Sequence, residues 1–138
     1  MKKGFTLVEL LIVLAVIAAL MAVATPMAMN AVKQAKASQI AQNLANIKTA
    51  AENYVNTERE FPTSIDSLVS MNYLSSKPAN LKIDASPTPV VWTNGQVKLI
   101  VKYTGADVAV ADVKKQNPDV KDDGYNNPML EATVVKWW

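Results

Sequence analysis

The stretch that decides the fold stands at the start of the chain and reads Lys2-Lys3-Gly4-Phe5-Thr6-Leu7-Val8-Glu9-Leu10-Leu11-Ile12-Val13-Leu14. Residues 10–24 are all apolar, and residues 27–29 continue the run past Pro26. The segment 5–29 therefore supplies 25 residues, whereas an α-helix needs about 20 to cross the hydrocarbon core of a bilayer. The sequence predicts one membrane-spanning helix at this position.

Lys2 and Lys3 precede the apolar segment and set its expected orientation. By the positive-inside rule, the N-terminus stays in the cytoplasm and everything after about residue 30 is exported. The net charge of +2 equals these two lysines, so the rest of the chain carries 12 basic and 12 acidic side chains. No basic patch remains that would favour nucleic acid as a partner.

The composition narrows the function classes further. The 138 residues leave room for one small globular domain beside the apolar segment. The chain has no cysteine and no histidine, which removes disulfides, thiolate chemistry, and the commonest general base and metal ligand. No motif supports a carboxylate or Ser-Lys mechanism in their place. We therefore expect a protein that is not an enzyme and holds no cofactor, apart from calcium at one turn.

Glu9 is a carboxylate inside an apolar run, which costs about 2.5–3.5 kcal/mol at the middle of a bilayer. It could reach back to the lipid headgroups, or it could pair with a cation. A cut after Gly4 would create a new α-amino group on Phe5. Glu9 of one subunit could then neutralise the Phe5 amine of its neighbour in an apolar filament core. An acidic residue near a helix N-terminus is also favoured by the helix dipole.

The run from Lys3 to Leu11, leading directly into an apolar helix, resembles the class III signal of type IV pilins and type II secretion pseudopilins. The resemblance implies that a prepilin peptidase cuts between Gly4 and Phe5 and methylates the new amine of Phe5. It also implies assembly roles for Glu9 and for Pro26, the helix-kinking proline. The implied partners are further copies of the chain, the peptidase, an inner-membrane assembly platform and, before assembly, membrane lipid.

The same resemblance implies a precursor in the inner membrane that ends in an extracellular pilus or a periplasmic pseudopilus. We prefer a type IV pilus subunit, used for adhesion, twitching motility or DNA uptake, with a pseudopilin as the alternative. Two alternatives in which the chain forms no filament also remain. A secretory signal could end at Ala22-Val23-Ala24, which fits a small-x-small cleavage site, or the helix could be an uncleaved anchor. Either would leave a binding domain that does not polymerise.

The expected organisation is a leader at 1–4, a transmembrane or filament-core half-helix at 5–29, an amphipathic half-helix at 30–57 and a head domain at 58–138. Residues 28–56 contain no glycine and no proline, so we expect the helix to continue past Pro26. Steps of four and three residues place one apolar stripe along it, formed by Ile40, Leu44, Ile47, Ala51 and Tyr54. The predicted fold class is α+β, a long N-terminal helix packed on a small C-terminal antiparallel sheet.

Turn and cap signals divide the head domain. Pro62 ends the long helix, and Thr63-Ser64-Ile65-Asp66 resembles a capping box that opens a short helix to about Met71. Asn94-Gly95 is typical of a type I′ turn, which predicts a hairpin over 90–101 with Thr93 opposite Gln96 and Trp92 opposite Val97. A short helix within 107–115 and a final strand over 131–138 complete a sheet of about three strands.

Two features of the head domain have open interpretations. Asp122, Asp123, Asn126 and Asn127 surround a glycine and offer the hard oxygen ligands that suit Ca²⁺. Major pseudopilins bind calcium in a C-terminal loop, but these residue types are also the ordinary ones of turns. The tryptophans at 92, 137 and 138 could form a subunit contact or adhesive patch, or pack in the core. The lack of cysteine departs from the pilins that carry a C-terminal disulfide.

Overall fold

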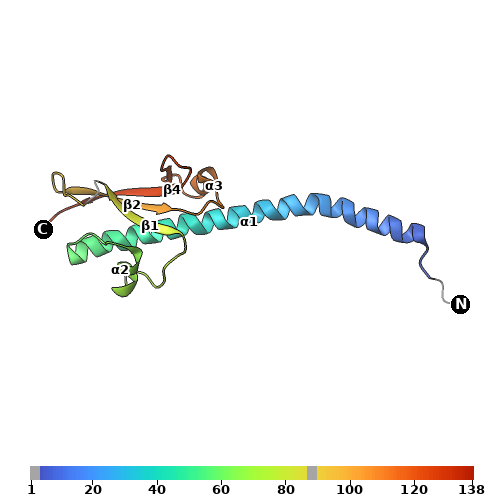
Figure 1. The fold of residues 1–138 in the computed structure, drawn as a ribbon, viewed down its shortest axis with the longest axis horizontal. Helices are drawn as coiled ribbons and strands as arrows, with labels where there is room; N and C mark the ends of the chain where they lie inside the picture. The colour runs from blue at the N-terminus through green and yellow to red at the C-terminus, as the bar shows by residue number, and fades with distance from the viewer. Residues whose placement is uncertain (1–3, 87–89) are drawn as a thin grey trace. The chain divides into compact units, whose positions relative to one another are not determined.

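The computed structural model describes residues 4–86 and 90–138. Two compact units emerge from it, the described residues of Met1–Ala35 and the unit Lys36–Trp138. The elements follow in the order α1 (Leu7–Glu58), α2 (Ile65–Ser70), β1 (Leu81–Ser86), β2 (Gln96–Tyr103), α3 (Val110–Gln116), β3 (Lys121–Asp122) and β4 (Pro128–Val135) (Figure 1).

Helix α1 runs through both units and contains Pro26 in its interior. The expected continuation past this proline is confirmed. A proline removes one backbone hydrogen bond and crowds the preceding turn, but the alanine-rich sequence on both sides favours helix. The helix ends at Glu58, where Arg59 takes a positive φ of 61° and its backbone N–H donates to the carbonyl of Val55 over 3.0 Å. This is the left-handed cap that commonly closes α-helices.

The part of α1 in the second unit buries one face. The predicted stripe is confirmed, because all five of its residues are buried together with neighbouring alanines and Val55. The full buried set of α1 is Ala37, Ile40, Ala41, Leu44, Ile47, Ala50, Ala51, Tyr54 and Val55. It forms one hydrophobic cluster with residues of α2, α3 and the sheet, and the strands lie along this part of α1 (Figure 1). The predicted α+β class is confirmed.

The sheet has four antiparallel strands in the order β1-β2-β4-β3. Strand β2 is central, pairs with both neighbours, and alternates buried and more exposed residues. Val97, Leu99, Val101 and Tyr103 are its buried side chains, as expected for a strand with one face on the core. Strand β3 pairs with β4 only through Lys121 and Asp122.

The predicted hairpin over 90–101 is correct at its turn and wrong in its first strand. Asn94 and Gly95 both have positive φ, 53° and 72°, and Thr93 and Gln96 exchange two backbone hydrogen bonds of 3.0 Å. Residues 90–92 belong to no strand, however, so Trp92 does not pair with Val97. The partner of β2 is β1, which the analysis of the sequence did not propose although 81–86 alternates apolar and polar residues. Four strands replace the expected three.

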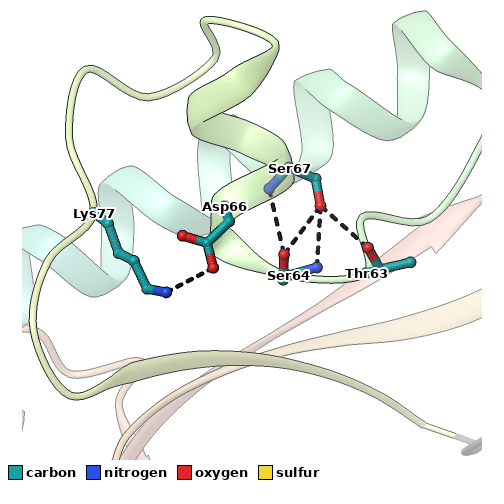
Figure 2. Close-up of polar contacts among 5 residues, drawn as sticks. All are labelled: Thr63, Ser64, Asp66, Ser67 and Lys77. Carbon is teal, nitrogen blue, oxygen red and sulfur yellow. Dashed lines mark hydrogen bonds and ion pairs between the residues drawn. The ribbon is translucent and has the colours of Figure 1, made fainter.

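The remaining local predictions need smaller adjustments. The short helix expected within 107–115 is confirmed as α3, and the last strand begins earlier, at Pro128, and ends at Val135. The capping box of α2 is shifted by one residue: Ser64 and Ser67 cap each other's backbone N–H groups at 3.3 and 3.2 Å, as Figure 2 shows. Asp66 instead pairs with Lys77 at 2.6 Å (Figure 2).

The buried stripe of α1 generates the first prediction. The Leu44 side chain is 0% exposed, so Leu44→Ala should destabilise the second unit by about 2–5 kcal/mol through lost burial and a cavity. Thr49→Ala, an exposed change on the same helix, should stay within about 0.5 kcal/mol. Thermal unfolding of the detergent-solubilised chain, followed by tryptophan fluorescence, measures both. Equal midpoints for the two variants would contradict the assigned core.

Candidate assembly site on the N-terminal helix

The described part of the first unit is a helix whose side chains are all exposed. Every residue from Gly4 to Lys36 is exposed, and the described part of the chain contains one helix long and apolar enough to cross a membrane, whose most apolar stretch is 0% buried. Large apolar side chains account for most of this surface, and they include Leu7, Leu10, Leu11, Ile12, Val13, Leu14, Val16, Ile17, Leu20, Met21, Val23, Met27 and Met29. Burying each such side chain contributes about 1.5–3 kcal/mol. Lipid or another polypeptide must therefore cover this helix.

Glu9 has a local role that the sequence analysis missed. Its Oε2 accepts the backbone N–H of Thr6 at 2.9 Å, and the Thr6 hydroxyl accepts the backbone N–H of Glu9 at 3.2 Å. These two bonds form a capping box with Thr6 as the N-cap, which satisfies two N–H groups at the helix start. The Thr-x-x-Glu spacing could have revealed it. Only one carboxylate oxygen of Glu9 is used in this way, so the other stays available to a cation.

The capping box places the predicted cleavage point outside the helix. Gly4 and Phe5 precede α1 and have no helical structure, and the Phe5 side chain is 88% exposed. A Cβ added to Gly4 would meet no atom within 4 Å. The fold of this chain therefore gives no packing reason for a glycine at position 4.

The turn at 122–127 is closed by its own carboxylates. Asp122 Oδ1 accepts the N–H groups of Gly124 and Asn126, both at 2.9 Å. Asp123 Oδ1 accepts those of Tyr125 and Asn127 at 2.8 and 3.2 Å, and the Asn127 side-chain amide donates to Asp123 Oδ2 at 3.0 Å. This bond is the main reason why the pKa of Asp123 is lowered, with burial acting in the opposite direction.

These hydrogen bonds limit how many oxygen atoms of the turn are free to bind Ca²⁺. Three of the four carboxylate oxygens of Asp122 and Asp123 already accept N–H groups, whereas Ca²⁺ takes six to eight oxygen ligands. Among the residues that the structure describes, no three acidic side chains gather at one point. The arrangement fits a hydrogen-bonded turn and does not fit a calcium cage, and calcium binding here stays an untested prediction.

A second polar cluster lies in a cleft of about 270 Å³ lined by residues of α1, β1 and β2. The Tyr103 hydroxyl donates to Asp107 at 2.5 Å, and Lys36 lies 3.3 Å from the other Asp107 oxygen. Burial and the bond to Asp107 raise the pKa of Tyr103, and the same bond lowers the pKa of Asp107. Lys36 balances the charge of Asp107, and the neutral Tyr103 hydroxyl donates to its other oxygen, so these three groups satisfy one another.

The tryptophans pack against one another at the end of the sheet. Trp92 and Trp138 are partly buried against the core, with ring centroids 5.5 Å apart, which confirms core packing for Trp92 and one terminal tryptophan. Trp137 is 63% exposed, and the Arg59 guanidinium lies 5.5 Å from its ring centre. A cation over an aromatic face contributes about 0.5–1 kcal/mol at exposed sites.

The turn at 122–127 generates a pH prediction. Because the pKa of Asp123 is lower in the folded chain, its charge stabilises the fold above the unfolded pKa of about 3.9. That stability is lost as pH falls through the folded value. Lowering pH from 6 to 3 should therefore reduce the thermal midpoint of the wild type more than that of Asp123→Asn, which keeps an acceptor oxygen but cannot be protonated. Equal losses would contradict the assigned role.

The same pair of proteins tests calcium. An ion that binds only the folded turn would raise the midpoint with increasing Ca²⁺ concentration, in the wild type and not in Asp123→Asn. An unchanged wild-type midpoint at millimolar Ca²⁺ would count against the calcium prediction.

Comparison with known proteins agrees with these observations. The family model described as the prokaryotic N-terminal methylation motif matches residues 1–25. Two curated proteins of Pseudomonas aeruginosa named fimbrial protein are each 26% identical over 144 residues, covering 99% of this chain and 90% of the relative. The type IV major fimbrial protein FimA of Dichelobacter nodosus is 28% identical over 103 residues, covering 75% of this chain and 63% of the relative. No solved structure matches this chain significantly.

The motif match covers the predicted cleavage point, Glu9 and most of the apolar run, and the fimbrial relatives extend the similarity over almost the whole chain. The long N-terminal helix with its exposed apolar half and the antiparallel sheet are the architecture that the resemblance implied. The N-terminal motif, the similarity to fimbrial proteins and this architecture together support the type IV pilin family for this chain.

Proposed function

We propose that this chain is the structural subunit of an extracellular type IV pilus, with a structural and not a catalytic role. The observation that carries the proposal is the uncovered helix in the first unit, where residues 4–36 are all exposed and mostly apolar. One environment with the required chemistry is the bilayer, which would hold the precursor. The other is a bundle of identical helices, in which each copy covers its neighbours.

Processing precedes assembly in this proposal. A prepilin peptidase cuts the exposed bond between Gly4 and Phe5 and methylates the new amine of Phe5. The N-terminus faces the cytoplasm until then, the C-terminal unit lies outside, and an inner-membrane assembly platform moves the subunit into the filament. Partial support comes from the methylation-motif match, which includes this bond.

Glu9 would then act twice. One carboxylate oxygen holds the helix start through Thr6, and the other pairs with the Phe5 amine of an adjacent copy. A charge pair in an apolar core is costly to break, at about 3–5 kcal/mol when one partner is removed. The pairing would therefore favour one register between neighbouring helices.

A pilus is preferred over a pseudopilus because the relatives that match this chain are named fimbrial proteins. A pseudopilin of a type II secretion system is the second candidate, since the same N-terminal helix would serve both. Adhesion, twitching motility and DNA uptake are the activities that a pilus of this kind would support.

The start of the native chain tests the processing step. N-terminal mass spectrometry of protein purified from its own cells should find a chain that begins at methylated Phe5. A start at Thr25 would indicate ordinary secretion, and an intact Met1 would indicate a static anchor. Either of those results would overturn the proposal.

Two substitutions separate the roles of Glu9. Glu9→Gln keeps an acceptor for the Thr6 N–H but loses the charge, whereas Glu9→Ala loses both. Both variants should still be processed, and both should reduce filaments by about tenfold or more if the ion pair contributes at least about 1.4 kcal/mol. Electron microscopy of material sheared from cells measures this, and extracellular filaments also distinguish a pilus from a pseudopilus. Normal filament numbers from Glu9→Gln would refute the charge pairing.

A further inference from the structure

Strand β4 has an open outer edge. Gly95 accepts a backbone hydrogen bond from Lys136, and Gln96 lies opposite Val135 in the next register position. Bonded and non-bonded pairs alternate along an antiparallel ladder, so the N–H and C=O groups of Glu131, Thr133 and Val135 point away from β2. Strand β3 ends its pairing with β4 at Met129. No other strand in the described part of the chain covers this edge.

The composition of this edge offers little protection against pairing. Natural sheets usually guard an open edge with lysine, proline or a bulge. Glu131 carries a charge, but Lys121 holds it at 2.7 Å. Thr133 is exposed and Val135 is 51% exposed, and both residue types favour extended structure. The edge is therefore suited to receive a further strand.

Residues 90–92 form a second segment whose backbone groups are unpaired within the described chain, and they could supply the missing strand. Val90, Val91 and Trp92 have strong strand propensity, but they lie in no strand, and their backbone groups have no hydrogen-bond partner among the described residues. The side chains of Val90 and Val91 are 41% and 54% exposed. An uncharged, β-prone segment of this kind can straighten and add to the open edge of a sheet, where its backbone groups would find partners.

The backbone of residues 90–92 lies away from the open edge of β4 in its own molecule, although the Trp92 ring contacts Trp138 beyond the end of that strand. Thr93 is bonded to Gln96 on the side of β2 that faces β1, which holds residues 90–92 next to that side. The open edge of β4 lies on the opposite side of β2, beyond a whole strand. Only the edge of a second copy is within reach of the segment.

We propose that residues 90–92 of one subunit add as a short strand to the β4 edge, residues 131–135, of the next subunit. The contact joins two different surfaces, so it is heterologous and propagates along an open assembly instead of closing a dimer. The inference rests on the proposed function, since it supplies a second contact between copies beyond the N-terminal helix. It identifies the partner of this edge as another copy of the same chain.

Proline at position 133 tests the edge directly. The Thr133 N–H points outward, so Thr133→Pro should leave the β2–β4 ladder intact, because proline is tolerated where the missing donor faces solvent. The substitution removes the central donor for an added strand. We expect an almost unchanged thermal midpoint and about tenfold less sheared filament than Thr133→Ala, equivalent to about 1.4 kcal/mol per contact. Equal filament yields from the two variants would overturn the proposal.

Cross-linking provides a second measurement because the chain has no cysteine. Cysteine at Val90 or Val91, combined with cysteine at Glu131, Thr133 or Val135, gives six double variants that sample both faces and three registers. Oxidation of intact filaments should produce a ladder of multimers from at least one pair, and none from the matched single variants. Dimers alone, or no cross-link in all six pairs, would overturn the proposal.

These results are separable from failure of the proposed function. If the wild type forms no filament and starts at Thr25 or Met1, the pilus proposal fails. If wild-type filaments form normally and Thr133→Pro filaments match those of Thr133→Ala, only the strand-addition contact fails.

Discussion

The uncovered apolar helix of the first unit is the constraint on which the rest of this protein depends. Beyond Lys36 the same helix has its own cover, since Leu44 and Ile47 are fully buried by the sheet and short helices. From Gly4 to Lys36 every residue is exposed among the residues that the structure describes. Surface of this kind is costly in water, so the first unit is stable only in lipid or against other helices. The proposed membrane insertion and the proposed polymerisation would both provide this cover.

Glu9 shows how one side chain can serve two stages. A charged group in an apolar environment must be paired or hydrogen-bonded. Before any partner is present, the capping box with Thr6 satisfies part of this requirement and also fixes the helix start after Phe5. The free carboxylate oxygen then remains for a cation. The cap and the proposed pairing are therefore compatible, because they use different oxygens of the same group.

In the second unit, two carboxylates have hydrogen-bond partners within the described part of the chain, whereas some backbone N–H and C=O groups do not. Asp123 is satisfied by the turn that it closes, and Asp107 is satisfied by Tyr103 and Lys36. The backbone groups of residues 90–92 and the outward groups of β4 have no such partners among the described residues. Unpaired backbone in β-prone segments favours contact with another strand. These open backbone groups are the basis of the proposed contact between copies of the chain.

The sequence alone determined the features that depend on residues close together in the chain. The apolar run, the stripe from Ile40 to Tyr54 and the Asn94-Gly95 turn each follow from local periodicity or backbone preference. The resemblance to pilins rests on the same local signals around Gly4 and Glu9. The two capping boxes also have local sequence signals. The Thr6–Glu9 box was not predicted, and the Ser64–Ser67 box was predicted one residue too early.

Tertiary structure alone decided the partners of the strands. Val90-Val91-Trp92 is as β-prone as any strand in the chain, yet β2 pairs with 81–86 on one side and 128–135 on the other. Local propensity cannot choose between such segments, because pairing depends on which alternating residues reach the core that α1 provides. Leu81, Ala85, Leu130 and Val134 reach it, whereas Val90 and Val91 stay exposed. The sequence therefore predicts which segments can be extended, and burial against α1 selects those that join the sheet.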